Sequence, residues 1–339
     1  MRIDLRPLAM AVPDAVVERL RGARCVLAVG HESPDADALG AAIAIGLIVE
    51  ARGGRATVAA SDALPELYRF LEGSDAVRTD PEPGVAYDLV VLCDCGDLSR
   101  VGAIRDRNAA LFAATPLLTI DHHASNAASG DLVWIDANAA ATCEMIALLA
   151  TRLGVPLALG MGRLAAALTA GIVMDTATFA HPNATPRTLQ VAAALVEAGA
   201  PLSEISRRLY RTKPDAQLAL FGRVLGRLQS HADGLVIAST MELADLVATG
   251  ARSEHSEGII DLLAQSETAE VALLLKEKDN ATRVSVRTKP GGVDATALCG
   301  TWGGGGHARA AGASLDLPLA DAAAVVLPVA IRFARAVAR

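Results

Sequence analysis

The sequence is poor in aromatic residues and has no long uninterrupted apolar segment. Phe, Trp and Tyr make up 3% of the 339 residues although 52% are hydrophobic. This composition is typical of a well-buried globular chain rather than a disordered or fibrous one. The longest apolar runs, Ala38–Val49 and Leu164–Met174, fall short of the ~20 residues that a membrane span requires. We therefore expect buried helices here and no association with a membrane.

Positive charge is also in short supply. The formal net charge is −7, so the overall field of the protein repels a polyanion. Long duplex nucleic acid is not expected as a partner, because duplex binding requires lysines and arginines that neutralise many phosphates. A small phosphorylated ligand remains compatible with this charge.

Neither a disulfide framework nor a secretion signal is expected. The five cysteines are odd in number and lack metal-knuckle spacing, which argues against both a disulfide scaffold and a zinc finger. The segment Met1–Leu20 carries Arg, Asp and Glu among its apolar residues and has no continuous hydrophobic centre. We expect a cytoplasmic protein.

Short β-branched runs alternate with Ala- and Leu-rich stretches in the first half of the chain. This pattern predicts an α/β fold, a parallel sheet with helices on both faces. The length favours two domains: a first domain at 1–186, a helical linker at 187–215 with a helix over Thr188–Tyr210, and a second domain at 216–339. The strands predicted for the first domain are Cys25–Val29, Ala56–Ala60, Asp88–Leu92, Leu117–Ile120 and Val133–Ile135.

The second domain is predicted to be a smaller α/β unit with a mixed sheet. A glycine tract, Gly303–Gly306, leads into a segment where we expect a helix to start, within Ala308–Ala311. The predicted strands are Leu235–Thr240, Val271–Glu277 and Thr282–Thr288, and the predicted helices are Met241–Val247 and Glu257–Gln265.

Polar clusters follow three strands of the first domain where these strands end. They are His31-Glu-Ser-Pro-Asp-Ala-Asp37, Cys93-Asp-Cys-Gly-Asp97 and Asp121-His-His123. Because ligands of doubly wound sheets bind outside the carboxyl ends of the strands, we expect the clusters to meet at one edge. Asp175 ends an apolar run, where a buried carboxylate needs a partner, and it could join the same edge.

Metal binding is the chemistry that these residues favour together. Histidine and several carboxylates supply the mixed nitrogen and oxygen ligands that Mn²⁺ and similar ions accept. Asp35 and Asp37 point in different directions at a helix start, which suits two neighbouring ions. Taken alone, Asp35 is better explained as a helix N-cap, and Asp94 could simply cap the next helix. Four clustered aspartates, however, call for about two divalent cations to balance their charge.

The motifs His31-x-x-x-Asp35-x-Asp37, Asp94, Asp121-His-His123 and Asp175 resemble those of the DHH phosphoesterases, which include RecJ-type nucleases, family II pyrophosphatases and bacterial nanoRNases. The segments GGGGHARAAG and Arg283-Val-Ser-Val-Arg287 resemble the DHH-associated substrate domain, so the resemblance spans most of the chain. These C-terminal motifs favour the branch that acts on short oligoribonucleotides, 3′-phosphoadenosine 5′-phosphate and linear or cyclic dinucleotides.

The resemblance implies a role for each matching residue. Asp94 would bridge two ions, Asp121 would orient His122, and His123 would lie near the scissile phosphate; these four form the expected catalytic set. The ions would be Mn²⁺, with Mg²⁺ or Co²⁺ as alternatives, and a homodimer is expected. The implied metal ligands are His31, Asp35 and Asp94 for one ion, and Asp37, Asp94, His122 and Asp175 for the other.

An anion clamp is predicted in the second domain, so that the substrate binds in the cleft between the domains. Glycine backbone can approach an anion closely, and the planar fork of arginine binds phosphate oxygens in pairs. Arg100 is a further candidate for contact with the reacting phosphate, a structural ion pair being the alternative. The predicted substrate-binding residues are Arg283, Ser285, Arg287, Gly304, Gly305, Gly306, His307, Arg309 and Arg100.

These observations predict a two-metal phosphoesterase that degrades short oligoribonucleotides to mononucleotides and dephosphorylates 3′-phosphoadenosine 5′-phosphate. Two metal ions can activate a water, so no covalent nucleophile is required. A cyclic-di-AMP or pApA phosphodiesterase is the nearest alternative. A family II-like pyrophosphatase is disfavoured because a glycine tract stands where a lysine-rich cage is expected, and a silent nucleotide-binding module is disfavoured because every implied ligand is present.

Overall fold

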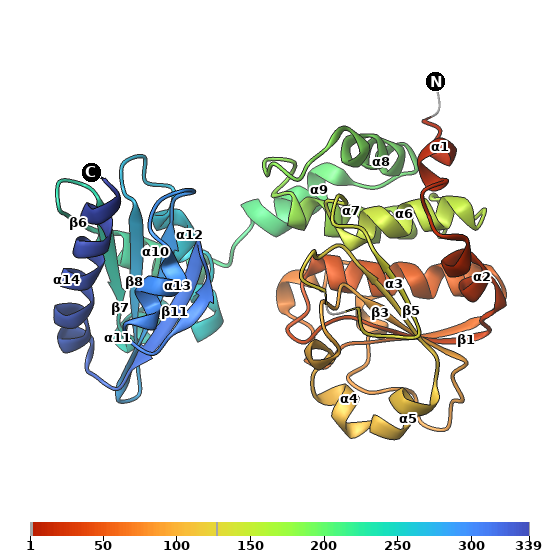
Figure 1. Ribbon diagram of the computed structural model, residues 1–339, viewed down its shortest axis with the longest axis horizontal. Helices are drawn as coiled ribbons and strands as arrows, with labels where there is room; N and C mark the ends of the chain where they lie inside the picture. The colour runs from red at the N-terminus through yellow and green to blue at the C-terminus, as the bar shows by residue number, and fades with distance from the viewer. Residues whose placement is uncertain (1–2, 127, 339) are drawn as a thin grey trace. The chain divides into compact units, whose positions relative to one another are not determined.

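The computed structural model describes residues 3–126 and 128–338, and the chain divides into two compact units, Met1–Thr212 and Lys213–Arg339 (Figure 1). Residues 187–212, which include most of the predicted linker, belong to the first unit. Each unit has its own sheet and its own apolar core.

The first unit contains a parallel sheet, as predicted for this half of the chain. The order of its strands is β2-β1-β3-β4-β5. Every expected strand is present, with its ends displaced by no more than one residue. The predictions succeed because the strands are buried and nearly continuously apolar, which sets them apart from the loops. The strands are β1 Cys25–Val29, β2 Arg55–Ala59, β3 Leu89–Cys93, β4 Leu117–Asp121 and β5 Leu132–Ile135.

Helices cover both faces of this sheet. Figure 1 shows α3, α6 and α7 on one side and α4 and α5 on the other. Alternate residues of β3 divide between the two layers: Leu89 and Val91 pack in the core that includes α3, whereas Val90 and Leu92 pack against Ile104 of α4. The covering helices are α3 Ala36–Ala51, α6 Thr142–Arg152, α7 Arg163–Asp175, α4 Ala103–Arg107 and α5 Ala109–Ala114.

Glycines allow α3 and α7 to pack closely at the functional edge of the sheet. A Cβ at Gly40 of α3 would lie 2.4 Å from the carbonyl oxygen of Ala167, and a Cβ at Gly171 of α7 would lie 2.3 Å from Asp37 Oδ1. Real Cβ atoms do not approach so closely, so the absence of a side chain at both positions is required for this packing.

The helix predicted over Thr188–Tyr210 is wrong as a single element. The segment forms α8 (Pro186–Glu197), α9 (Leu202–Ser206) and a π-helical turn, η4 (Arg207–Arg211). Gly199 has a φ of +104° and Pro201 follows it, and both residues stop a helix. The remaining helices of this unit are α1 Arg6–Ala9, α2 Asp14–Gly22, η1 Glu66–Tyr68, η2 Ser74–Ala76 and η3 Leu98–Val101.

The second unit contains a mixed sheet, as predicted. The order of its strands is β10-β11-β9-β8-β7-β6. Only the β7–β8 pair is parallel. The three predicted strands correspond to β7, β8 and β9, with ends displaced by no more than one residue. The strands are β6 Gln229–His231, β7 Val236–Met241, β8 Val271–Lys278, β9 Ala281–Thr288, β10 Gly305–His307 and β11 Ala310–Leu315.

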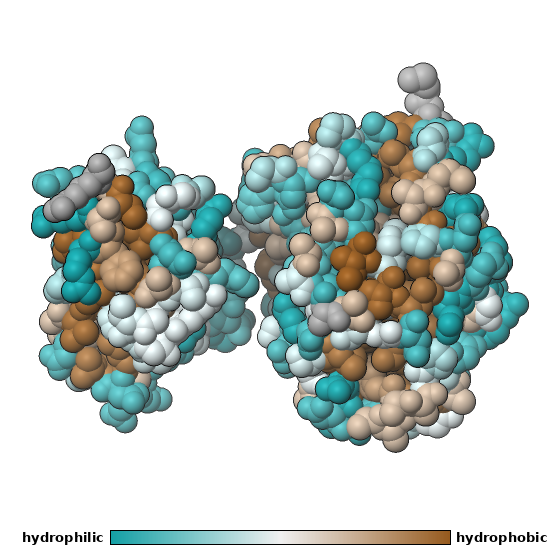
Figure 2. All heavy atoms as spheres, viewed as in Figure 1, coloured by the Kyte–Doolittle hydropathy of each residue, from teal (hydrophilic) through white to brown (hydrophobic). Residues whose placement is uncertain are grey.

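This second sheet is also covered on both faces. One face packs on α13 and α14 and the other on α10 and α12, and Val284 and Val286 of β9 point into the former core. Figure 2 shows apolar side chains at the surface over α14, where Val325 and Val337 are exposed. The helices are α10 Asp215–Leu225, α11 Leu243–Thr249, η5 Ser253–Ser256, α12 Ile259–Leu263, α13 Ala295–Gly300 and α14 Leu319–Val337.

The helix expected to start within Ala308–Ala311 is wrong. The glycine tract and the residues after it form the antiparallel pair β10–β11, in which Gly305 opposes Gly312 and His307 opposes Ala310. The alternation of buried Ala311, Ala313 and Leu315 with less buried residues has the strand period of two, and pairing with β9 extends the sheet. Across the residues that the structure describes, no helix is both long and apolar enough to cross a membrane.

Candidate metal centre

The polar clusters predicted to meet do so at the carboxyl ends of β1, β3 and β4. His31 follows β1, Asp94 follows β3, and Asp121 ends β4 immediately before His122. Asp94 has a φ of +59°, an uncommon conformation for a non-glycine residue, and its amide donates to the carbonyl of Ile120. The chain therefore turns sharply at Asp94, so that its side chain enters the cluster.

Asp94 lies at the centre of the histidines. Its Oδ2 is 3.6 Å from His31 Nε2, and its Oδ1 is 3.6 Å from His122 Nε2 and 3.5 Å from His123 Nδ1. Asp94 is only 2% exposed. The two oxygens of one buried carboxylate thus face different histidines, as a bridging ligand would require.

Asp35 caps a helix with one carboxylate oxygen and turns the other towards the cluster. Its Oδ1 accepts hydrogen bonds from the amides of Asp37 and Ala38, so it is the N-cap of α3. Its other oxygen, Oδ2, is 3.8 Å from His31 Nε2. His31 Nδ1 is 2.6 Å from the carbonyl oxygen of Glu32, and a donor at Nδ1 leaves Nε2 with its lone pair towards the carboxylates.

A second group forms around His122. Its Nε2 is 3.0 Å from Asp175 Oδ2, at the end of α7, and 4.0 Å from Asp37 Oδ2, in the first turn of α3. His122 Nδ1 faces the carbonyl oxygen of Ala139 at 3.3 Å. The Nε2 atom is buried and has no partner in hydrogen-bonding geometry among the described residues. A buried ring nitrogen that faces carboxylates from separate elements is suited to share a cation with them.

The electrostatics of the cluster also suit a cation. Burial, and then the neighbouring Asp175 carboxylate, raise the pKa of Asp37 to about 7. Burial and the surrounding carboxylates also raise the pKa of Asp94 well above its ordinary value, and burial raises the pKa of Asp175. A divalent cation would replace this repulsion with attraction.

The histidine pKa values reflect the same field. Burial opposes protonation of His122, but the nearby Asp175 and Asp37 carboxylates outweigh burial and raise its pKa to about 9. Burial likewise opposes protonation of His31, but Asp35 and the Glu32 carbonyl raise its pKa. For Asp35, burial is outweighed by His31 and two backbone amides, so its pKa is lowered.

Candidate ligand atoms within 4.8 Å of one another form three groups in the described part of the chain. The donor set is nitrogen and carboxylate oxygen, which Mn²⁺, Mg²⁺ and Co²⁺ accept. The residues present therefore fit metal binding. The groups are His31, Asp35 and Asp94; Asp37, His122 and Asp175; and Asp94, His122 and His123.

Asp121 holds His123 rather than His122, which corrects the orientation expected from the sequence. Its Oδ1 is 2.8 Å from His123 Nδ1, and its Oδ2 accepts from Asn126 Nδ2. Burial would raise the pKa of Asp121, but the bonds from His123 and Asn126 lower it. His122 is oriented by a backbone carbonyl instead, because the Asp121 side chain is turned towards residue 123.

Sequence reasoning missed several residues that contact the cluster. Thr142 binds both Asp37 and Asp94, and Asn183 Nδ2 donates to the carbonyl oxygen of Asp175. The Tyr210 hydroxyl donates to the Met174 carbonyl, next to Asp175, and burial followed by the Asp175 and Asp35 carboxylates raises its pKa to about 12. A neutral Thr or Asn carries no signal of such a contact in the sequence.

Arg100, predicted to touch substrate, is exposed in η3. Its backbone carbonyl oxygen accepts from the Glu32 amide at 2.6 Å, so Arg100 lies beside the loop that carries His31. Arg100 forms no ion pair among the described residues, which removes the structural ion pair as its explanation.

In the second unit, Arg283, Ser285 and Arg287 share one face of β9, as their spacing predicted. Arg287 Nε is bonded to Asp261 of α12 at 2.9 Å. Arg283 has no carboxylate partner among the described residues; its Nη1 is 3.3 Å from Ser314 Oγ.

Lys276, which lies opposite Arg283 in the β8–β9 register, was not among the predicted substrate-binding residues. Burial, and then Lys278 and Arg283, lower the pKa of Lys276.

The glycine tract lies at the edge of the second sheet. Gly305, Gly306, His307 and Arg309 are exposed and Gly304 is half-buried. A Cβ at Gly304 would lie 2.3 Å from the Gly312 carbonyl oxygen. Glycine is therefore needed at 304 for chain approach, while the edge strand β10 leaves backbone groups available for a ligand.

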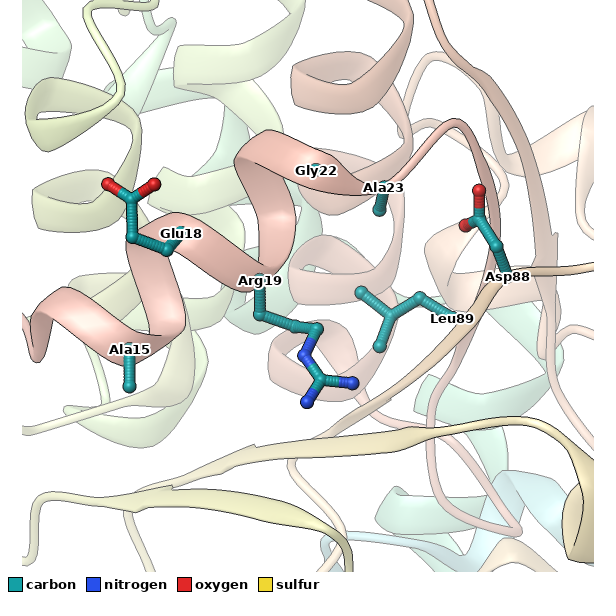
Figure 3. A pocket seen from close by; sticks show the side chains of 7 residues that line it. All are labelled: Ala15, Glu18, Arg19, Gly22, Ala23, Asp88 and Leu89. Carbon is teal, nitrogen blue, oxygen red and sulfur yellow. The ribbon is translucent and has the colours of Figure 1, made fainter.

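An open depression lies at the other end of the first sheet (Figure 3). Arg19 and Glu18 of α2 line it beside Asp88, which precedes β3. The Asp88 carboxylate accepts from the amides of Arg24 and Cys25 and so closes a local turn. The depression therefore lies at the amino ends of the strands, away from the clustered His and Asp residues.

Comparison with known proteins gives consistent matches. Residues 25–172 match the DHH family, N-terminal domain, and residues 234–335 match the DHHA1 domain. The chain is 32% identical over 289 residues to the bifunctional oligoribonuclease and PAP phosphatase NrnA of Thermus thermophilus, covering 84% of this chain and 82% of the relative. It is 29% identical over 287 residues to the Bacillus subtilis protein of the same name, covering 84% and 87%.

A solved structure shares the fold. An exopolyphosphatase-related protein from Bacteroides fragilis superposes with a TM-score of 0.85 and 19% identity, covering 96% of this chain and 97% of that one. At this identity the similarity speaks for the architecture, and the evidence on chemistry comes from the clustered side chains described above.

Proposed function

Because the chain belongs to the DHH family of metal-dependent phosphoesterases, we propose that it hydrolyses short oligoribonucleotides to mononucleotides and dephosphorylates 3′-phosphoadenosine 5′-phosphate. The observation that carries the proposal is the buried His122 Nε2, which faces carboxylate oxygens of three aspartates from separate elements at 3.0 to 4.0 Å. The names of the two NrnA relatives support this choice of substrates.

Two divalent ions, Mn²⁺ in our proposal, would supply an activated water and neutralise charge on the phosphoryl oxygens. His31, Asp35 and Asp94 would hold one ion, and Asp37, Asp94, His122 and Asp175 the other. Each set includes a histidine whose Nδ1 faces a backbone carbonyl, so its Nε2 is the nitrogen left for metal binding.

His123 would act on the substrate rather than on a metal. Its side chain is 41% exposed, more than that of either His31 or His122. Asp121 fixes the Nδ1 side of the ring, which leaves Nε2 to donate to a phosphate oxygen of the substrate. Arg100, exposed and near His31, would contribute a second positive contact.

The second unit would bind the rest of the substrate. Arg283, Ser285, Arg287, His307, Arg309 and the glycines 304–306 are the proposed contacts. Arg283 is the strongest candidate, because its guanidinium has no carboxylate partner among the described residues. Arg287 is bound to Asp261, and this ion pair would have to break before Arg287 could bind a ligand. Short substrates fit a chain with a net charge of −7, because long nucleic acids are bound by lysines and arginines that neutralise many phosphates.

We propose catalysis by residues 1–186, a connecting role for 187–215 and substrate binding by 216–339. We further propose that the protein works in the cytoplasm as a homodimer. The free cysteines, of which Cys93, Cys95, Cys143 and Cys299 are buried, fit a reducing compartment.

The test is a substrate panel with purified protein and Mn²⁺. Di-, tri- and pentaribonucleotides and 3′-phosphoadenosine 5′-phosphate should be hydrolysed, and Asp94→Asn should abolish turnover. Cyclic-di-AMP, pApA and pyrophosphate form the remaining arms. Faster cleavage of any of these would replace the proposed substrate, and tight nucleotide binding at full Mn²⁺ occupancy without turnover would show a silent binding module.

A further inference from the structure

One short segment, Ala139–Cys143, contacts three of the proposed metal ligands directly. The Ala139 carbonyl oxygen faces His122 Nδ1 at 3.3 Å. The amides of Thr142 and Cys143 donate to the two oxygens of Asp37 at 2.6 and 2.9 Å, and the Thr142 hydroxyl donates to Asp94 Oδ1 at 3.0 Å. The position of this segment therefore sets the position of the ligands.

The same segment reaches Asp175 through Asn183. Asn183 Nδ2 donates to the carbonyl oxygen of Ala140 at 3.2 Å and to that of Asp175, also at 3.2 Å. A displacement of Ala140 would thus be transmitted to the end of α7.

A buried carboxylate anchors the segment. Glu144, in the first turn of α6, is 0% exposed. Its Oε2 accepts from the Ala140 amide at 3.1 Å and from the Thr188 hydroxyl at 2.7 Å, and its Oε1 accepts from Arg187 Nε at 2.5 Å. All three donors belong either to this segment or to the first turn of α8.

Arg187 connects the anchor to the start of the loop. Its Nη1 donates to Asp136 Oδ2 at 2.8 Å, and the Asp136 amide in turn donates to the carbonyl oxygen of Asp121 at 3.1 Å. Glu144 and Arg187 together therefore fix the loop at both ends, after β4–β5 and at the start of α6.

Stability alone is a poor reason for such an arrangement. Burying an ion pair costs desolvation energy, and an apolar pair of the same volume is often at least as stable. Outer residues that orient metal ligands, in contrast, have a direct effect on metal affinity. We infer that Glu144 and Arg187 are positioning residues, which hold the Ala139–Cys143 segment so that His122, Asp37, Asp94 and Asp175 converge on the metals. This inference rests on the proposed metal centre.

The experiment measures Mn²⁺ affinity by calorimetry and the Mn²⁺ electron paramagnetic resonance spectrum in the full chain. Glu144→Gln keeps the size and an oxygen acceptor but removes the charge that Arg187 binds. We expect its Mn²⁺ Kd to rise about 10–100-fold, the effect typical of lost outer-shell partners, with a broadened spectrum. Arg187→Lys keeps the positive charge but cannot bind Glu144 and Asp136 at the same time, as the guanidinium does. We expect a smaller rise in the Mn²⁺ Kd for this variant.

Asp245 offers a matched control, because it is also a fully buried acid with arginine partners. Its partners are Arg223 and Arg227. Asp245 contacts none of the proposed metal ligands in the described residues. Asp245→Asn should lower the melting temperature of the metal-free protein yet leave the Mn²⁺ Kd unchanged. Glu144→Gln that melts earlier but binds Mn²⁺ like wild type would overturn the inference.

Two outcomes distinguish a failure of this inference from a failure of the proposed function. If wild-type protein binds no Mn²⁺, the proposed metal centre fails and the inference fails with it. If wild type binds Mn²⁺ and hydrolyses the substrate while the variants match it, only the inference fails. If Glu144→Gln does not fold, Arg187→Lys and Thr188→Val, which removes a single hydroxyl from the anchor, decide the question by the same Kd.

Discussion

Thr142 binds two aspartates at once: its amide donates to Asp37 Oδ2 at 2.6 Å and its hydroxyl donates to Asp94 Oδ1 at 3.0 Å. Thr142→Val keeps the shape and the amide but removes the hydroxyl. Since a hydrogen bond to a charged group contributes about 1.5–3 kcal/mol, Asp94 should lose its orientation. We expect kcat on a trinucleotide to fall about 10–100-fold, measured with saturating Mn²⁺.

Thr142→Ser supplies the control for this prediction, because it restores the hydroxyl without the methyl group. Its kcat should stay close to that of wild type. Equal losses in the serine and valine variants would mean that packing of the methyl group, not the bond to Asp94, is what the site requires.

Gly171 of α7 is predicted to be irreplaceable for the metal centre. A Cβ at this position would lie 2.3 Å from Asp37 Oδ1 and 2.5 Å from Cys143 Sγ. Gly171→Ala must therefore displace Asp37 or separate α3 from α7, at a cost of about 1–3 kcal/mol for overpacking. We expect Mn²⁺ affinity and thermal stability to fall together.

Gly222 is the matched position for this test. It is an exposed glycine within α10, and a Cβ there would meet nothing within 4 Å. Gly222→Ala should stabilise the protein by about 0.5–1 kcal/mol, because alanine loses less backbone entropy in a helix, and Mn²⁺ binding should not change. A Gly171→Ala protein that binds Mn²⁺ normally would show that α3 and α7 can separate freely.

The contact between Asp121 and His123 predicts an effect on turnover rather than on metal binding. Asp121→Asn should leave His123 free to rotate or to change its tautomer, because the 2.8 Å contact at Nδ1 loses its charge. We expect kcat to fall about 10–100-fold, with an Mn²⁺ Kd near that of wild type. Asp97→Asn, at a half-buried aspartate whose side chain caps η3, should change neither quantity. A large change in the Kd of Asp121→Asn would instead make Asp121 a contributor to metal binding.

The sequence was sufficient to predict the strands of the first sheet, three strands of the second (β7, β8 and β9), and the convergence of His31, Asp94 and His122. Buried parallel strands are continuously apolar, and topology then places their carboxyl ends at one edge. The predicted N-cap at Asp35 is confirmed, and because only one oxygen caps α3, the other is free to face His31.

Other parts could not be predicted, for physical reasons that differ from place to place. The contact of Asp121 with His123 depends on side-chain rotation that spacing does not fix. The positions of Thr142 and Glu144 depend on a turn that packs against α3 and α8. Ala308–Ala311 has a helix-forming composition, but pairing with β9 overrides local propensity. The bond from Arg287 to Asp261 joins β9 to α12 and is visible only in three dimensions.

Acid should destabilise the second unit through Asp245. Its bonds with Arg227 and Arg223 hold the pKa of this carboxyl well below its ordinary value, against the opposing effect of burial. A depressed pKa in the folded state contributes stability that is complete above the unfolded pKa of about 3.9 and is lost as the pH falls towards the folded value. The difference in unfolding free energy between wild type and Asp245→Asn should therefore be constant above about pH 5 and shrink below about pH 4.

Urea unfolding in the presence of a chelator measures this difference without contribution from bound metal. Glu242→Gln is the control, because Glu242 is half exposed and lies 4.0 Å from Arg227. It should have little effect at any pH. A wild-type to Asp245→Asn difference that stays constant down to about pH 3 would show that the carboxyl is not the group that titrates.

Arg283 is predicted to bind a substrate phosphate. It lies on the face of β9 that also carries Ser285, it forms no ion pair among the described residues, and Lys276 opposite it adds a second positive charge. Like charges facing each other across two strands are unfavourable without an anion. Arg283→Ala should raise KM for a trinucleotide about 10-fold or more, the value of one charge-assisted bond, with a smaller change in kcat and unchanged Mn²⁺ affinity.

Gly312→Ala should act in the same direction, because a Cβ there would lie 2.9 Å from Arg283 Nη2. Arg332→Ala, in α14, is the control for loss of an arginine charge and should leave KM unchanged. If Arg283→Ala and Arg332→Ala give the same KM, the charge on β9 does not contact the substrate.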